Sequence, residues 1–146
     1  MISITKMCKE HIDAVYAIEC DSFAVPWSKD SLFKDFSQKH AHYFVAVDDS
    51  GEVCGYCGMW HIVNEGHITN IAVKPDTRRQ GIGEKLVGRL IDLAYEKEMI
   101  GITLEVRMNN APAHALYAHM GFKPEGIRKG YYSDTKEDAV IMWKYL

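Results

Sequence analysis

The sequence has few of the features that mark fibrous, secreted or membrane proteins. Among its 146 residues there are only four prolines and four cysteines. No apolar run approaches the roughly 20 residues of a membrane-spanning helix, and the N-terminus lacks the basic and then apolar pattern of a secretory signal. These absences argue against a disulfide scaffold and a membrane protein, so we expect a cytoplasmic protein with no membrane partner.

Neither sign of charge dominates the composition. The formal net charge is -3 and the isoelectric point is about 6.1. Because nucleic-acid affinity depends largely on clustered lysine and arginine, we expect no nucleic-acid partner, whereas a basic peptide stays compatible. Hydrophobic residues make up 47% and charged residues 25% of the chain, as in globular proteins, and the length suits one domain. We therefore predict a single domain over residues 1–146.

The cysteines and the seven histidines form no metal or redox motif. Cys54 and Cys57 have C-x-x-C spacing, but they lie in an extended pattern, in which residues three apart point to opposite faces. The redox version of this motif opens a helix, and the zinc version needs a second pair. We predict no metal, and free thiols at all four cysteines: Cys8, Cys20, Cys54 and Cys57.

Hydrophobic periodicity predicts a mixed α+β fold around one largely antiparallel sheet. The expected strands are residues 2–5, 42–47, 53–63, 67–73, 100–107, a strand from residue 122 onward, and 138–144. The expected helices are residues 10–22, a helix capped by Ser28, residues 81–98, and a short helix that Asn110 caps and Gly121 ends. Strands and helices alternate after residue 66, which makes the middle strands parallel.

A basic, glycine-containing turn links the strand at residues 67–73 to the next helix. Gly81 and Gly83 open that helix, and glycine lets the backbone approach a ligand closely. The N–H groups of a first helical turn have no internal partner, and the positive end of the helix dipole lies there with Arg78 and Arg79 nearby. The turn is thus a candidate pyrophosphate cradle; an ordinary strand-to-helix loop is the alternative.

Other phosphate motifs do not fit this turn. A dinucleotide fingerprint needs a third glycine where Leu86 stands, and a P-loop needs G-K-[ST], which is absent. The letters R-R-Q-G-I-G at 78–83 instead resemble the Q/R-x-x-G-x-G/A signature of the GNAT N-acetyltransferases, which bind acetyl-coenzyme A. The segments N-I-A-V at 70–73 and N-N-A-P-A-H-A-L-Y-A-H-M-G-F at 109–122 match as well.

The resemblance implies the GNAT fold, a single mostly antiparallel mixed sheet of six to seven strands with helices on both faces. It implies acetyl-coenzyme A (acetyl-CoA) as co-substrate, with the pantetheine arm paired to the strand and the pyrophosphate in the turn. The implied cofactor contacts come from the strand, the turn and the capping asparagine: Ile71, Ala72, Val73, Arg78, Arg79, Gln80, Gly81, Ile82, Gly83 and Asn110.

Glu105 interrupts the apolar strand I-T-L-E-V at 102–106. A carboxylate in such a strand is rare unless it is paired or has a function. If it is partly desolvated, its pKa should rise toward the neutral range, as suits a general base. The alternative is a structural ion pair, for example with Arg107.

Further segments resemble the branch of the family that acetylates the N-terminal alanine of ribosomal proteins. These are L-E-V-R-M-N-N at 104–110, A-L-Y at 115–117 and M-G-F at 120–122. By this resemblance Glu105 is the base, Asn110 contacts coenzyme A and Tyr117 protonates the leaving thiolate. Met108 and Pro112 depart from the usual pattern and bear on the geometry of the short helix. From composition alone, Tyr117 would be a core residue.

The same resemblance places the acceptor beside two aromatic segments. The segment F-A-V-P-W-S at 23–28 supplies Trp27, and the turn at 130–134 supplies Tyr131 and Tyr132. The aromatic-rich helices around Trp27 could cover the core, form a lid over a substrate groove, or do both. The two tyrosines could equally be packed loop aromatics.

Amine basicity favours an α-amine acceptor. An α-amino group titrates near 7.7 to 8.0 and lysine near 10.4, so deprotonation at neutral pH costs about 1 kcal/mol for the former and about 4 to 5 kcal/mol for the latter. We expect an acetyl-CoA-dependent acyltransferase acting on a protein N-terminus, the N-terminal alanine of a basic ribosomal protein, as a monomer or weak homodimer. The alternatives are an enzyme for a small amine such as a polyamine, and a non-catalytic acyl-CoA-binding module.

Overall fold

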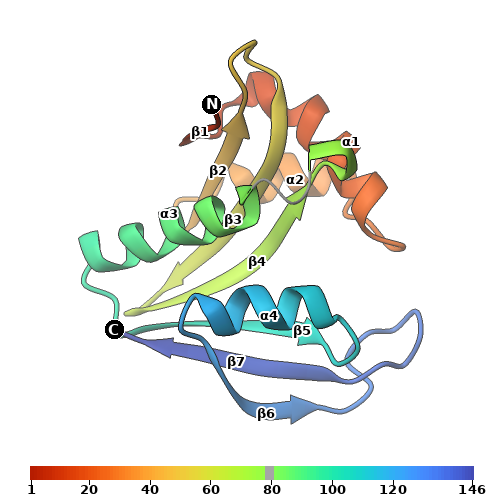
Figure 1. The fold of residues 1–146 in the computed structure, drawn as a ribbon, viewed down its shortest axis with the longest axis vertical. Coiled ribbons are helices and arrows are strands. Elements are labelled where there is room, and N and C mark those ends of the chain that lie inside the picture. Colours follow the sequence, from red (N-terminus) through yellow and green to blue (C-terminus); the bar gives the residue numbers. More distant parts are fainter. Residues whose placement is uncertain (78–80) are drawn as a thin grey trace.

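The computed structural model describes residues 1–77 and 81–146, and the predictions for Arg78, Arg79 and Gln80 lie outside these ranges. Seven strands form one sheet in the order β1-β2-β3-β4-β5-β7-β6 (Figure 1). Their bounds are β1 Ser3–Lys6, β2 Ala41–Val47, β3 Val53–Ile62, β4 Glu65–Val73, β5 Gly101–Arg107, β6 Lys123–Arg128 and β7 Ala139–Tyr145. Only β4 and β5 are parallel, so the predicted α+β class with a mostly antiparallel mixed sheet is confirmed.

The four predicted helices are present, and their bounds differ from the predicted ones by at most about two residues. They are α1 Ile12–Ser22, α2 Lys29–Phe36, α3 Ile82–Glu96 and α4 Ala111–His119, with short 3-10 turns η1 at Lys9–His11 and η2 at Pro75–Thr77. The Ser28 hydroxyl accepts the Ser31 N–H at 3.1 Å, and Asn110 caps α4 in the same way. Gly121 follows α4 with φ 97°, a left-handed conformation that favours glycine.

Helices cover both faces of the sheet. On one face, α3 and α4 pack on a large core, in which Leu86, Leu90 and Leu104 are buried. On the other, α1 and α2 pack on a smaller core around Val45 and Tyr56. Figure 1 shows α3 and α4 in front of the strands, with α1 and α2 beside β2 to β4. Within the described residues, no helix is long and apolar enough to cross a membrane.

The parallel strands β4 and β5 are paired only near their N-terminal ends. Its ladder joins residues 65–67 to residues 101–103 and extends no further. Just beyond, Gly58 pairs with Asn70 while the next residue of β3 pairs with Ile68, so Thr69 is an extra residue in β4. Such a bulge bends the strand and increases its twist. The two strands therefore diverge toward their C-terminal ends, as Figure 1 shows.

A second bulge corrects one expectation about the cysteines. Cys54 and Cys57 are both buried in the core under α3, whereas their spacing predicted opposite faces. The reason is that Ala46 pairs with Gly55 and Val47 with Val53, which leaves Cys54 as an extra residue in β3. All four cysteines are free, as predicted.

A substitution at Gly58 tests how closely β3 and its neighbouring strands pack at the bulge. A Cβ there would lie 2.7 Å from the buried Tyr43 ring and 3.1 Å from Thr69 Oγ1. We expect Gly58→Ala to lower the free energy of unfolding by about 1 to 3 kcal/mol, the range for overpacking. In the matched control Gly88→Ala, the new Cβ in α3 lies 3.9 Å from Met120 Cε, an ordinary van der Waals contact, and alanine should stabilise the helix. Urea unfolding curves measure both, and equal midpoints would contradict the expectation.

Candidate active site

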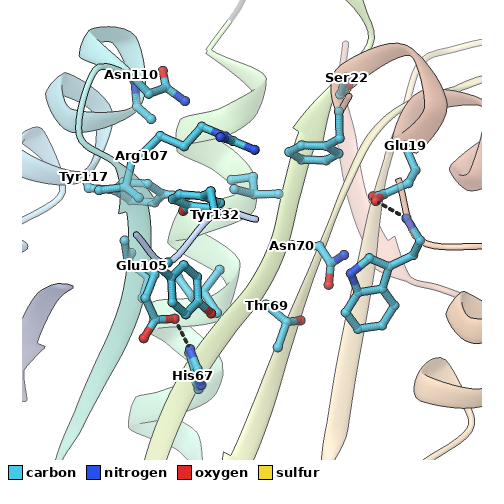
Figure 2. Close-up of a pocket in the computed structure, with 18 of the residues that line it drawn as sticks. Glu19, Ser22, His67, Thr69, Asn70, Glu105, Arg107, Asn110, Tyr117 and Tyr132 are labelled. Carbon is cyan, nitrogen blue, oxygen red and sulfur yellow. Dashed lines mark hydrogen bonds and ion pairs between the residues drawn. The ribbon is translucent and has the colours of Figure 1, made fainter. Parts of the chain in front are cut away.

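A cavity of about 530 Å³ lies where β4 and β5 diverge. Its walls come from those two strands, from α4, from the loop between α1 and α2, and from the loop between β6 and β7 (Figure 2). It brings together seven residues that the sequence nominated: Trp27, Ile71, Glu105, Asn110, Tyr117, Tyr131 and Tyr132. These residues span more than 100 positions of the chain, so only the fold makes them neighbours.

Among the described residues, the other predicted cofactor contacts lie outside the cavity lining: Ala72, Val73, Gly81, Ile82 and Gly83. Ala72 belongs to the core under α1, and Ile82 is buried in the core under α3. Gly81 is the N-cap of α3 with φ 73°, and apart from its chain neighbours no atom of residues 1–77 and 81–146 lies within 4 Å of the position its Cβ would take. Gly83 packs against Leu116 of α4. Within the described part of the chain, the start of α3 is thus uncrowded at its N-cap and tightly packed at Gly83.

Glu105 is held by two side chains that the sequence did not nominate. Its Oε1 lies 2.8 Å from His67 Nε2, and its Oε2 accepts from Arg128 Nε at 3.3 Å. The hydrogen bond from His67 is the main cause of a lowered pKa, and the charge of Arg128 adds to it. The expectation of a raised pKa was therefore wrong, because these partners outweigh the effect of burial on a side chain that is 9% exposed.

Arg107 does not pair with Glu105, although the sequence left that open. Its guanidinium binds Asp134 at 3.0 Å and Glu137 at 3.4 Å, and it lies 4.0 Å from the centre of the Tyr132 ring. These contacts tie β5 to the loop that carries both tyrosines. Tyr131 packs edge to face on Tyr132 with ring centres 5.1 Å apart. The loop with both tyrosines is therefore fixed to β5, the strand that bears Glu105.

A buried carboxylate fixes the opposite loop. Glu19 of α1 is 2% exposed, accepts the Trp27 N–H at 2.9 Å and also accepts the Tyr56 hydroxyl. Figure 2 shows Glu19 across the cavity from Glu105. An acidic residue beside Ile18 on the apolar stripe of α1 was the signal in the sequence that could have identified this anchor.

Tyr117 is both a core residue and a cavity residue. Its side chain packs edge to face on Phe122 with ring centres 5.7 Å apart, and only 5% of the residue is exposed. Burial raises the pKa of its phenol, so the group stays protonated at neutral pH and is able to donate. Both alternatives from the sequence thus describe part of its environment.

Asn110 has a divided role at the start of α4. Its side-chain oxygen accepts the Ala113 N–H at 3.2 Å as the helix cap. Since the oxygen is used in this way, the side-chain amide group is the donor that a ligand in the cavity would meet. In residues 1–77 and 81–146, no three His, Cys, Asp or Glu side chains are grouped as metal ligands.

Comparisons with known proteins agree with the site's composition. The model of the Acetyltransferase (GNAT) family matches residues 12–122. A provisionally named ribosomal protein bS18-alanine N-acetyltransferase of Bacillus subtilis is 45% identical over 142 residues, covering 97% of this chain and 93% of the relative. The Escherichia coli enzyme of that name is 33% identical over 144 residues, covering 97% and 96%. The crystal structure of the Escherichia coli ribosomal-protein-S18-alanine N-acetyltransferase superposes with a TM-score of 0.91, covering 99% of this chain and 94% of that one.

The lowered pKa of Glu105 predicts a pH dependence of stability. A carboxyl group whose pKa is lower in the folded state stabilises the fold above its unfolded pKa, near 4.3, and this contribution disappears as the pH falls through the folded value. We expect Glu105→Gln to reduce the loss of unfolding free energy between about pH 5 and pH 3. Urea unfolding across this range measures the effect. Identical pH slopes for the variant and the wild type would contradict it.

Proposed function

Since the chain belongs to the GNAT acetyltransferase family, we propose that it acetylates the N-terminal α-amine of a ribosomal protein whose first residue is alanine. Membership makes the protein an acetyl-CoA-dependent acyltransferase. The observation that supports this choice of acceptor is the cavity between β4 and β5, which Glu105, Tyr117 and the two aromatic loops line together. Two relatives at 45% and 33% identity are named for ribosomal protein bS18 as acceptor.

The chain has suitable groups for the extended and charged parts of acetyl-CoA. The ladder between β4 and β5 stops at His67, so the edge of β4 around Ile71 faces the cavity instead of β5. The N–H groups of the first turn of α3, after Gly81, and the side-chain amide of Asn110 suit the diphosphate and the arm. Contacts from Arg78, Arg79 and Gln80 stay predictions. When bound, acetyl-CoA supplies an activated acyl thioester.

Trp27, Tyr131 and Tyr132 form the acceptor side in this proposal. Trp27 is held through its backbone by Glu19, and Tyr132 is held through its ring by Arg107. Aromatic side chains fixed in this way offer large contact areas at little cost in conformational entropy. The two loops thus suit an extended peptide end better than a compact ligand.

Glu105 belongs to the base that takes the proton from the acceptor amine. Its lowered pKa keeps the carboxylate ionised at neutral pH, which favours a cationic amine beside it. A lowered pKa also makes a carboxylate a weaker base. An α-amine needs only about 1 kcal/mol for deprotonation at neutral pH, whereas lysine needs about 4 to 5 kcal/mol. The site is therefore matched to N-termini rather than to lysine side chains.

Tyr117 is the proton donor to the leaving thiolate. Its phenol is protonated at neutral pH because burial raises its pKa, and it lines the same cavity as Glu105. Donation at the sulfur avoids the release of a free thiolate anion into a poorly solvated site. The carboxylate thus takes part in removing a proton from the amine, and the tyrosine supplies a proton to the sulfur.

An acceptor panel tests the proposed function. Purified protein with acetyl-CoA should acetylate a basic peptide that begins with alanine, and should leave the same peptide with a blocked N-terminus, its lysines intact, unmodified. Intact-mass spectrometry measures the product, and a panel of free polyamines serves as comparison. Turnover of the polyamines alone would reject the peptide acceptor, and cofactor binding without any turnover would indicate a binding module.

Removal of the phenolic hydroxyl group tests the role of Tyr117. We expect Tyr117→Phe to lower kcat by about 100-fold, the lower end of the range for general acid catalysis, with little change in the KM for acetyl-CoA. Phenylalanine preserves the packing on Phe122, so unfolding curves should stay close to those of the wild type. A raised KM with unchanged kcat would show that the residue positions the cofactor instead.

A further inference from the structure

His67 is the partner of Glu105 that the steps above leave unused. It occupies the last ladder pair before β4 and β5 diverge, opposite Thr103. Its side chain is 31% exposed, against 9% for Glu105, and the two are joined by the 2.8 Å contact between Nε2 and Oε1. In Figure 2 the dashed line joins His67 to Glu105 at the end of the cavity away from Asn110. The imidazole is thus the more exposed member of a connected pair.

The charged groups around the pair come from several elements. Arg128 of β6 binds the second oxygen of Glu105, and Tyr131 lies 6.0 Å from the Arg128 guanidinium. From β3, Trp60 packs edge to face on the His67 ring at 6.0 Å between ring centres. The indole N–H of Trp60 is bound by Asp35 of α2. His67 therefore lies between a fixed indole and a carboxylate whose two oxygens are both occupied.

This arrangement leaves one difficulty for Glu105 as the sole base. A carboxylate stabilised in its ionised form by His67 and Arg128 takes up a proton readily only at acidic pH. Imidazole is the side chain whose protonation ordinarily changes between pH 5 and 8. When two titrating groups interact strongly, an added proton belongs to the pair and not to either residue. The imidazole, 2.8 Å from the carboxylate, is thus a second place in the pair for that proton.

We propose that His67 and Glu105 form one proton-accepting pair, in which the imidazole carries the proton of the acceptor amine to solvent. The inference rests on the proposed function for the identity of the acceptor. As the amine nitrogen bonds to the acetyl carbon, an N–H bond breaks and its electrons stay on nitrogen. The proton converts neutral imidazole to imidazolium beside the ionised carboxylate, and the imidazolium then gives it to water. The sequence marks His67 only as the start of an apolar strand pattern.

The variant His67→Gln separates proton transfer from positioning. The glutamine amide can still donate to Glu105, but it cannot carry a proton at neutral pH. We expect kcat/KM to fall at least about 10-fold near pH 7, and the acid limb of its pH profile to move to lower pH, because the remaining base is a carboxylate with a lowered pKa. The control is His61→Gln, at the neighbouring position to Trp60 on β3, which should behave like the wild type. An unchanged rate, or a slower rate with an unchanged acid limb, would overturn the proposal.

A second measurement needs no acceptor. We expect the NMR signals of the His67 imidazole, assigned with His67→Gln, to change position in Glu105→Gln, since Nε2 lies 2.8 Å from the carboxylate that the substitution replaces. Unchanged signals would show that the two groups are not in contact and would overturn the pair. If the wild type acetylates only free amines, the proposed acceptor fails, and the kinetic comparison is made with those amines instead. Failure of the acceptor and failure of the pair are therefore distinguishable.

Discussion

The early end of the ladder between β4 and β5 is the constraint on which the site depends. Backbone N–H and C=O groups need partners, and neighbouring parallel strands normally supply them along their whole length. Here the ladder covers three residue pairs, after which the two halves of the sheet each continue with their own neighbours. The gap is consequently walled by rigid strands, and its backbone edge suits a ligand that itself carries amide groups.

Two carboxylates on opposite sides of this gap, the buried Glu19 and the largely buried Glu105, have different roles because of their partners. Glu19 accepts from a backbone N–H and a tyrosine hydroxyl, neither of which changes charge near neutral pH. It therefore anchors the Trp27 loop. Glu105 contacts an imidazole and a guanidinium, so its proton affinity is set by groups that are themselves charged or titratable. Burial alone does not distinguish an anchor from a reactive group, whereas the partner chemistry does.

The sequence predicted the elements well because their signals are local. Ser28 and Asn110 begin helices and Gly121 follows the end of one, all through local contacts or conformation, and the alternation after residue 66 predicted the parallel pair. The partners of Glu105 could not be predicted, because they depend on which strands lie side by side and in which register. The lowered pKa of Glu105 and the shared face of Cys54 and Cys57 were missed for the same reason. The alternation of apolar and polar residues predicts which face each side chain of a regular strand occupies, but one extra residue in a bulge changes that assignment.

The bulge at Thr69 determines which side chains of β4 face each side of the sheet. On its N-terminal side Ile68 faces the core under α3, and on its C-terminal side Ile71 does so too, although strict alternation would send them to opposite faces. If Thr69 instead took a place in a regular ladder, strict alternation would turn one half of the strand over, carrying His67 away from Glu105 or Ile71 out of the cavity. Exchange of side chains along β4 therefore leaves its two faces unchanged, whereas insertion of one further residue would exchange the faces in one half of the strand.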